Sequence, residues 1–506
     1  MLDNDRAEYR DRRPHFSQGH AATVHCTRAS QYALLWGSHG GTGLARRCWR
    51  GAQGHTPTVR PGVPGRRSSG TWRPGNRGKA GKDMREWGAS VSSAVAGIVN
   101  ARVLDGLGGV VERATVVLRE GRIERIQPGA MPLPDAPGWI DLGGRTLLPG
   151  LVDAHVHLSS YPEYLGIPAP LRGELPPARE VRYFALATGA QALLRAGFTT
   201  IRDVGSPDDE QIHLREAIRC GLTSGPRILH CGRIISATAP GGAVFGTMYR
   251  EADGPDEMRK AVREQLRRGA DYVKIMATGA RSVVLEDPER AQMTHQEAAA
   301  VVDEAHRMGK RVAAHVEGAR LAIAAGVDTV EHGLSLHREP ALLGAMAERG
   351  TVLVPTLSTF HDVSEIHACL YPPVLVEQAV RQREEAYRTL RAARDAGVTL
   401  AMGFDSAPHG NNALELIRMV SGGLTPGQGI VAATSGSAAA LGLPGIGRIA
   451  AGAAADLIVV DGDPLADIGI LGRRERILLV LQAGRPVAGA LLDAPDAEAA
   501  MRRLGR

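Results

Sequence analysis

The residues best suited to chemistry follow short apolar runs in the middle of the chain. The first such run, "PGLVDAHVHL", carries His155 and His157 two positions apart. In a β-strand, side chains at positions i and i+2 point to the same face, so both imidazoles can bind one metal ion. The pair therefore predicts a metal site where this strand ends.

Comparable groups stand in four later apolar runs. They are Lys274 in "DYVKIMAT", His315 in "RVAAHVEG", His332 in "TVEHGL" and Asp405 in "VTLAMGFDS". Taken singly, each has an ordinary explanation, because a lone histidine near a strand end is more often a hydrogen-bonded core residue than a ligand. Their recurrence at the ends of five strands favours one shared metal centre.

Lys274 is unusual because arginine supplies nearly every other positive charge. After residue 83 the only lysines are Lys260, Lys274 and Lys310. Burial and nearby cations lower the pKa of a lysine and leave a neutral, nucleophilic amine. Such an amine can add carbon dioxide and become a carbamate that bridges two metals, which a guanidinium cannot do. The alternative is a lysine whose ammonium group reaches water along its own stem.

The elements that must position these groups are set by length and composition. The chain has 506 residues, of which 43% are hydrophobic, so a large domain and a smaller one are expected. The net charge of +6 is uneven, because residues 1–83 hold 15 Lys+Arg against 5 Asp+Glu. The remainder is mildly acidic, so binding of nucleic acid would depend on this leading segment alone.

Four regions are expected along the chain. Residues 1–83 lack periodicity and predict a disordered basic extension, or a region upstream of a true start at Met84. Residues 84–146 and 446–506 contain short strands separated by Gly and Pro and are expected to pair into one β-sandwich. Residues 147–445 alternate eight apolar strands with amphipathic helices, which predicts a (β/α)₈ TIM barrel of the α/β class. Two of its helices are expected over 256–268 and 295–308, the second opened by a capping box of Thr294 and Glu297.

Cysteine usage and hydropathy bear on the compartment. The five cysteines include no C-x-x-C pair, so neither a disulfide framework nor a cysteine zinc site is indicated. No apolar stretch reaches the roughly 18 residues of a membrane span, and the charged start does not resemble a secretory signal. We expect a cytoplasmic homo-oligomer that acts on a small molecule and has no membrane or nucleic-acid partner.

Taken together, "PGLVDAHVHL", "DYVKIMATG", "AAHVEG", "VEHG" and "GFDS" resemble the amidohydrolase superfamily. The similarity extends over about residues 94–490 and is greatest to the imidazolonepropionase-related branch, which includes Xaa-Pro dipeptidases and hydrolases of N-acyl amino acids and carbamates. "AGFTTIRDVGS" and "GAAADLIVVDGDPL" also resemble that branch. The resemblance implies a barrel with a flanking β-sandwich and two divalent metal ions, usually Zn²⁺.

The resemblance also implies a role for each ligand. His155, His157 and Asp405 would hold the more buried ion, and His315 and His332 the more exposed one. Lys274, carboxylated by CO₂, would bridge the two ions. Asp405 would accept a proton from metal-activated water and return it to the leaving nitrogen, so that a C–N bond is hydrolysed without an organic cofactor.

Two positions depart from the relatives' pattern and bear on how substrate is held. Ala243 in "ATAPGGAVFG" stands where relatives commonly carry histidine, and Glu317 stands where they often carry an aromatic residue or histidine. Arg281 is a candidate for pairing with a substrate carboxylate, although it has the alternative of being a solvated surface residue. His409 in "APHGNN" is a second candidate substrate-binding residue. Other polar groups of the long loops are Arg290, His361, His367 and Tyr371.

The expected activity is hydrolysis of dipeptides, Xaa-Pro-like in kind, or of N-acyl amino acids. Hydrolysis of carbamate, urea or ester xenobiotics on the same site is an alternative, because loop chemistry and not the metals separates these substrates. A third interpretation is an inactive scaffold protein of the same fold. An inactive relative should have lost ligands, and none is missing here.

Overall fold

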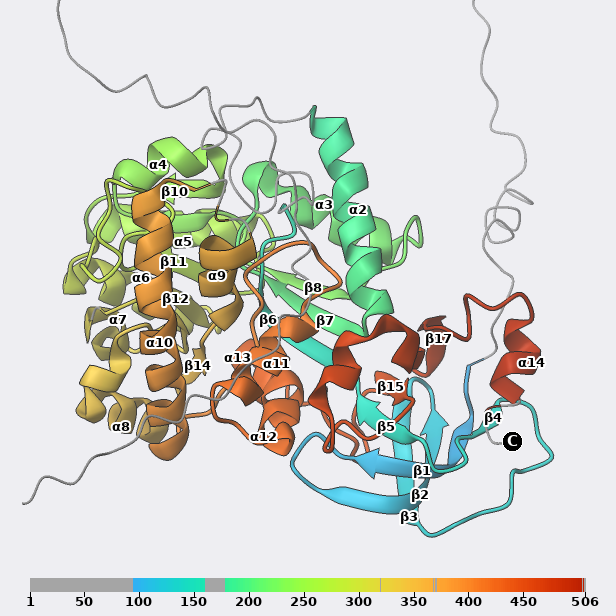
Figure 1. Cartoon of the computed structure of the whole chain (residues 1–506). Helices are drawn as coiled ribbons and strands as arrows, with labels where there is room; N and C mark the ends of the chain where they lie inside the picture. Colours follow the sequence, from blue (N-terminus) through green and yellow to red (C-terminus); the bar gives the residue numbers. More distant parts are fainter. Residues whose placement is uncertain are drawn as a thin grey trace, which may run out of the picture. The chain divides into compact units, whose positions relative to one another are not determined.

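The computed structural model describes residues 94–159, 178–318, 320–366, 368, 371–502 and 504. The expected basic extension over residues 1–83 lies outside the described residues. In the described part, one mixed eight-stranded sheet and two parallel sheets are accompanied by helices (Figure 1). No helix among the described residues is long and apolar enough to cross a membrane.

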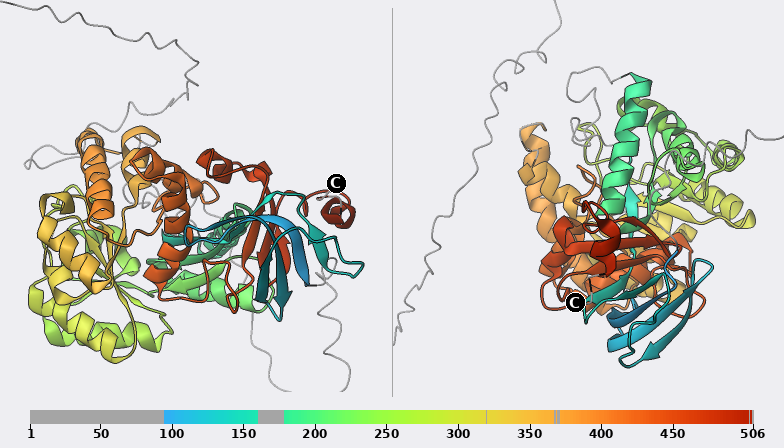
Figure 2. Two further views of the ribbon diagram at one scale, coloured as in Figure 1. Left: turned by 90° about the horizontal axis from the view of Figure 1, so that it is seen from below. Right: turned by 90° about the vertical axis from the view of Figure 1, so that its right-hand side faces the viewer.

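Strands from both ends of the described chain build one eight-stranded sheet. It contains β1 (Gly97–Leu104), β2 (Val110–Arg119), β3 (Arg122–Pro128), β4 (Trp139–Asp141), β5 (Thr146–Pro149), β15 (Leu457–Val460), β16 (Ile477–Gln482) and β17 (Arg485–Ala488). The order is β17-β16-β15-β5-β1-β2-β3, and β4 pairs with β1. The two ends meet where β5 runs antiparallel to β15, with Leu457 opposite Pro149. Figure 2 shows the blue and red strands side by side in both views.

The first predicted strand is in fact two strands in two sheets. "LLPGLVDAHVHL" breaks at Gly150, so β5 joins the eight-stranded sheet and β6 (Leu151–Val156) joins a parallel sheet. The Gly150 N–H donates to the carbonyl of Asp456. A Cβ at Gly150 would lie 2.2 Å from Oγ1 of Thr199, so only glycine allows this close approach. The chain therefore changes sheets within a single residue.

The central part of the chain forms two parallel sheets. The first contains β6, β7 (Phe198–Asp203) and β8 (Arg227–His230). The second has the order β10-β9-β11-β12-β13-β14 and consists of β9 (Ile234–Ser236), β10 (Tyr249–Glu251), β11 (Val273–Met276), β12 (Val312–Val316), β13 (Thr329–His332) and β14 (Val352–Val354). Seven of the eight apolar runs predicted as barrel strands thus contain strands.

The eighth predicted run, residues 398–406, contains an irregular segment, 399–405, that occupies a strand's place. Its only β-bridge among the described residues joins Leu400 to Leu353 of β14. The Ala401 N–H donates to the Leu353 carbonyl (2.9 Å), and the Ala154 N–H of β6 donates to the Met402 carbonyl (2.8 Å). The segment therefore lies between β14 and β6. Its own N–H at Met402 bonds instead to the Ala432 carbonyl and to Oγ of Ser437, which interrupts a regular ladder.

Helices follow most of the parallel strands. They include α2 (Arg179–Arg195), α3 (Glu210–Arg219), α4 (Pro240–Phe245), α5 (Pro255–Arg267), α6 (His295–Arg307), α7 (Arg320–Ala325), α8 (Pro340–Arg349), α9 (Leu357–His361), α10 (Pro373–Asp395), α11 (Ala413–Ser421), α12 (Pro426–Val431), α13 (Ser437–Leu441) and the terminal α14 (Ala497–Arg502). The two helices expected over 256–268 and 295–308 correspond to α5 and α6. The capping box of Thr294 and Glu297 is confirmed in both directions.

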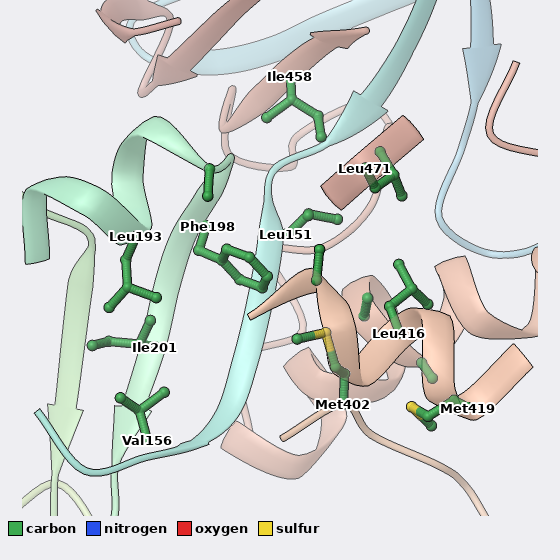
Figure 3. Close-up of a cluster of buried hydrophobic side chains, with 14 of the residues drawn as sticks. Leu151, Val156, Leu193, Phe198, Ile201, Met402, Leu416, Met419, Ile458 and Leu471 are labelled. Atoms are coloured by element: carbon green, nitrogen blue, oxygen red, sulfur yellow. The ribbon is translucent and has the colours of Figure 1, made fainter. Parts of the chain in front are cut away.

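One hydrophobic core joins the parallel sheet to the strands of the chain ends. Its buried side chains come from β6, β7, α2, α11, β15 and the segment around Met402. In Figure 3, Phe198 of β7 lies between Leu193 of α2 and Leu151 of β6. These contacts fix the position of β6, which carries the first two predicted metal ligands.

Replacing Phe198 with alanine tests this core. Phe198 is fully buried, so Phe198→Ala should lower the free energy of unfolding by about 3–5 kcal/mol. The matched control is Phe184→Ala on α2, where the side chain is 76% exposed and the change should stay within about 0.5 kcal/mol. Urea unfolding monitored by circular dichroism measures both. Equal effects of the two substitutions would contradict this account of the core.

Candidate metal centre

A cavity of about 450 Å³ lies where the parallel strands end. Its lining includes all six residues predicted as metal ligands, namely His155, His157, Lys274, His315, His332 and Asp405. They come from β6, β11, β12, β13 and the segment 399–405. Because parallel strands present their carboxyl ends at the same edge, residues far apart in sequence meet here.

His155 and His157 form the first group around Asp405. The Nε2 atoms of the two rings lie 3.5 and 3.7 Å from Oδ1 of Asp405. Nδ1 of His155 lies 2.7 Å from Oε2 of Glu331, and Nδ1 of His157 lies 2.7 Å from the Gly205 carbonyl. Since carboxylate and carbonyl oxygens accept, each Nδ1 carries the proton and each Nε2 keeps a lone pair toward Asp405. This is the arrangement of histidines that bind a metal through Nε2.

His315 and His332 form a second pair, and His332 also lies close enough to His155 and Asp405 to share a cation with them. The ring centroids of His315 and His332 are 4.4 Å apart. Nε2 of His315 donates to the Gly279 carbonyl at 3.0 Å, which leaves a lone pair on Nδ1. Nδ1 of His332 lies 3.8 Å from Oδ2 of Asp405. The two oxygens of Asp405 thus face different histidine groups.

The histidines of both groups are neutral at pH 7. Burial lowers the pKa of His155 and of His157 to about 4. Burial, with the charge of Lys274 or of the neighbouring histidine, lowers the pKa of His315 and His332 well below 6.5. A neutral imidazole is the form that binds metal, so the site needs little proton release from these rings.

Lys274 of β11 is buried, with 2% of its surface exposed. Its Nζ has no hydrogen-bond partner within the part of the chain that the structure describes. Burial lowers its pKa to about 8, mainly by desolvation. A buried ammonium group without a partner is costly, and the lowered pKa makes the neutral, nucleophilic amine accessible near pH 8. The donor set as a whole fits a metal centre.

The backbone at two candidate ligands is left-handed. Asp405 has φ of +44° and His332 has φ of +72°. Non-glycine residues in this region cost energy and cluster at functional sites. The Asp405 N–H donates to the His155 carbonyl at 3.0 Å, which holds the strained residue against β6. Burial raises the pKa of Asp405 above its usual value, although the charges of His155 and Arg281 oppose this shift.

Glu331 is a supporting residue that the sequence analysis missed. It is fully buried on β13 and receives hydrogen bonds from Nη2 of Arg202 (2.7 Å) and Oγ1 of Thr329 (2.5 Å), in addition to that from His155. It therefore fixes the orientation of a predicted metal ligand. A signal was available, because Glu331 directly precedes His332 in "VEHG" and is a charge within an apolar strand.

Asp153 is a second missed residue and connects β6 to the segment that carries Asp405. Its Oδ1 accepts from the backbone N–H groups of His155 (3.0 Å) and Phe404 (3.2 Å). Its Oδ2 accepts from Nδ2 of Asn412 at 2.8 Å. The residue lies two positions before His155 in "LVDAHVH", a spacing that places it on the same strand face.

The structure places the two candidate substrate-binding residues differently. Arg281 lines the cavity, and its Nε lies 2.8 Å from Oε1 of Glu317. His409 is buried, and its Nε2 donates to the His157 carbonyl at 3.1 Å. It is not among the described residues that line the cavity. Its position favours support of His157 over contact with substrate.

The remaining loop residues fall in different places. Ala243 and Tyr371 line the cavity. Arg290 is exposed and bonds to Asp287, so it takes no part in the site. His361 contacts Tyr387 and Glu365 outside the cavity lining. His367 lies outside the described residues.

Histidines, a lysine and an aspartate at the carboxyl ends of parallel strands are typical of metal-dependent hydrolases. Comparison with known proteins identifies the family. The chain belongs to the amidohydrolase family, whose sequence pattern matches residues 146–487.

Three proteins similar to this chain are an ochratoxinase, a Xaa-Pro dipeptidase and an imidazolonepropionase. The ochratoxinase of Aspergillus niger is 31% identical over 375 residues, which cover 68% of this chain and 76% of the relative. A crystal structure of a Xaa-Pro dipeptidase with methionine bound in the active site superposes with a TM-score of 0.70 at 31% identity, covering 78% of this chain and 99% of that one. The imidazolonepropionase of Paracoccus denitrificans is 27% identical over 394 residues, which cover 70% of this chain and 89% of the relative.

Proposed function

We propose that this chain is a binuclear metal-dependent amidohydrolase whose catalytic domain, residues 147–445, is a closed (β/α)₈ barrel flanked by a β-sandwich from residues 84–146 and 446–506. The observation that carries the proposal is the buried, unpartnered amine of Lys274 beside four neutral imidazoles and Asp405. His155, His157 and Asp405 would hold one ion, His315 and His332 the other, and carbamylated Lys274 both. Imidazole and carboxylate donors favour Zn²⁺.

The bound ions would supply an activated water nucleophile and polarise the scissile carbonyl. The chain itself supplies the proton transfer. Oδ1 of Asp405 faces His155 and Oδ2 faces His332, so one carboxylate oxygen can accept a proton from the attacking water. It can then return the proton to the leaving nitrogen as the C–N bond breaks.

The cavity lining supports an amide substrate with an apolar part and a carboxylate. Aromatic and apolar side chains form much of the lining, among them Phe245, Met248, Tyr249, Phe360 and Tyr371. Arg281 contributes a cation close to His332. Apolar pockets with a few polar groups bind small molecules and orient them. We therefore propose dipeptides, Xaa-Pro-like in kind, or N-acyl amino acids as substrates. The similarity to a Xaa-Pro dipeptidase and to an ochratoxinase supports this choice.

The test combines a substrate panel with metal analysis. Purified protein should contain about two zinc-like ions per chain and hydrolyse members of a panel of dipeptides and N-acyl amino acids. Dialysis against a chelator should abolish hydrolysis, and added Zn²⁺ should restore it. Protein that binds no metal, or that hydrolyses the panel equally well after complete metal removal, would overturn the proposal.

A further inference from the structure

We propose that Glu317 is a positioning residue that aims Arg281 at the carboxylate of the substrate, so that the two residues together set a preference for acidic amides. This inference rests on the proposed hydrolysis of amides and adds the group by which the substrate is recognised.

The two residues meet because they follow neighbouring parallel strands. Arg281 lies beyond β11 and Glu317 directly follows β12, and these strands are paired. Nε of Arg281 lies 2.8 Å from Oε1 of Glu317, with side-chain exposures of 14% and 0%. This is an ion-pair contact at the edge of the cavity, and neither Glu317 oxygen has a hydrogen-bond partner among the described residues.

A second contact fixes the plane of the guanidinium group. Cζ of Arg281 lies 4.0 Å from the centre of the Phe360 ring, a cation–π distance. Nη2 of Arg281 lies 3.3 Å from Nδ1 of His332, a candidate metal ligand. With Nε beside Glu317 and one face covered by Phe360, the guanidinium group is held close to the candidate metal ligands.

The burial of Glu317 explains why the arginine cannot simply turn to solvent. A fully buried carboxylate that loses its cation is strongly destabilised, so the ion pair holds Arg281 in place. A guanidinium group fixed in this way can bind a carboxylate through two parallel hydrogen bonds with little loss of side-chain entropy. Pre-organisation of this kind strengthens binding without a new contact.

The test compares an N-acyl amino acid with its carboxamide, using Glu317→Gln, Arg281→Gln, the double variant and Arg290→Gln as control. Arg290 is an arginine of the same loop with 85% of its side chain exposed. For the carboxylate substrate, KM should rise about tenfold or more in Arg281→Gln and about fivefold in Glu317→Gln, since charged hydrogen bonds have this magnitude. We expect kcat to change by less than about twofold, because the contact orients bound substrate and is not made only in the transition state.

Three further readouts separate positioning from other roles. The KM for the carboxamide should not change in any variant, and the metal content should stay constant. Adding Glu317→Gln to Arg281→Gln should not raise the KM for the carboxylate substrate further, because Glu317 acts through the arginine. His315, Glu317 and His332 also lie close enough to share a cation. Two results would overturn the inference. One is loss of metal in Glu317→Gln, and the other is a KM in the double variant that is raised beyond that of Arg281→Gln alone.

The two proposals fail in distinguishable ways. If wild-type protein hydrolyses carboxylate and carboxamide substrates with equal kcat/KM, recognition through Arg281 is wrong while amide hydrolysis stands. If it hydrolyses no amide with metal bound, the proposed function is wrong and this inference falls with it.

Discussion

Lys274→Ala is expected to lower kcat/KM by a factor on the order of 10³, because it removes the only residue proposed to bridge both ions, and metal catalysis contributes several kcal/mol. The metal content should fall below two ions per chain in the same preparation. Lys274 is fully enclosed, so alanine also leaves a cavity, and circular dichroism must show that the variant is folded.

Two further substitutions make this result specific. Lys274→Arg keeps a positive charge but cannot form a carbamate, so it should lose activity as fully as the alanine variant. Lys310→Ala replaces a partly exposed lysine away from the cavity and should leave kcat/KM unchanged. Activity that survives in Lys274→Ala would refute a carbamate ligand.

Arg202→Met should lower the free energy of unfolding by about 3–5 kcal/mol, the cost of leaving a buried carboxylate without its cation. Arg202 is almost fully buried and donates from Nη2 to Glu331 and from Nε to the Ala154 carbonyl. The matched control is Arg219→Met, because Arg219 pairs with Glu216 at 72% exposure and its replacement should leave stability nearly unchanged. Urea unfolding of metal-free protein measures both variants.

The stability cost of Arg202→Met should depend on pH with a defined sign. Burial alone would raise the pKa of Glu331, but the charges of Arg202 and Lys274 outweigh it and hold that pKa well below 4.5. A carboxyl group with a depressed folded pKa contributes stability above its unfolded value, and this contribution is lost as the pH falls. The difference between wild type and Arg202→Met should therefore shrink on acidification below about pH 4.5. A difference that grows in acid would contradict the ion pair.

The location of the candidate site could be predicted from local sequence. The H-x-H spacing, one lysine in an arginine-rich chain, and two histidines and an aspartate each following an apolar run predicted six residues that the structure places around one cavity. This worked because parallel strands bring their carboxyl ends to one edge whatever their separation in sequence. The capping box of α6 was predictable for the same reason, since all its atoms lie within four residues.

Contacts between strands could not be predicted in this way. The sequence did not show that the chain changes sheets at Gly150, because the obstacle is the side chain of Thr199, almost 50 residues away. Nor did it show that Glu331 holds His155, or that His409 lies behind His157 instead of in the cavity.

The sequence by itself therefore determined which residue types stand at the strand ends, and hence the family and the kind of reaction. Only the tertiary structure decided which of them touch. Arg281 and Glu317 illustrate the difference, since each is an ordinary charged residue in its own segment. The register of β11 against β12 makes them a buried pair, and register depends on packing across the whole sheet.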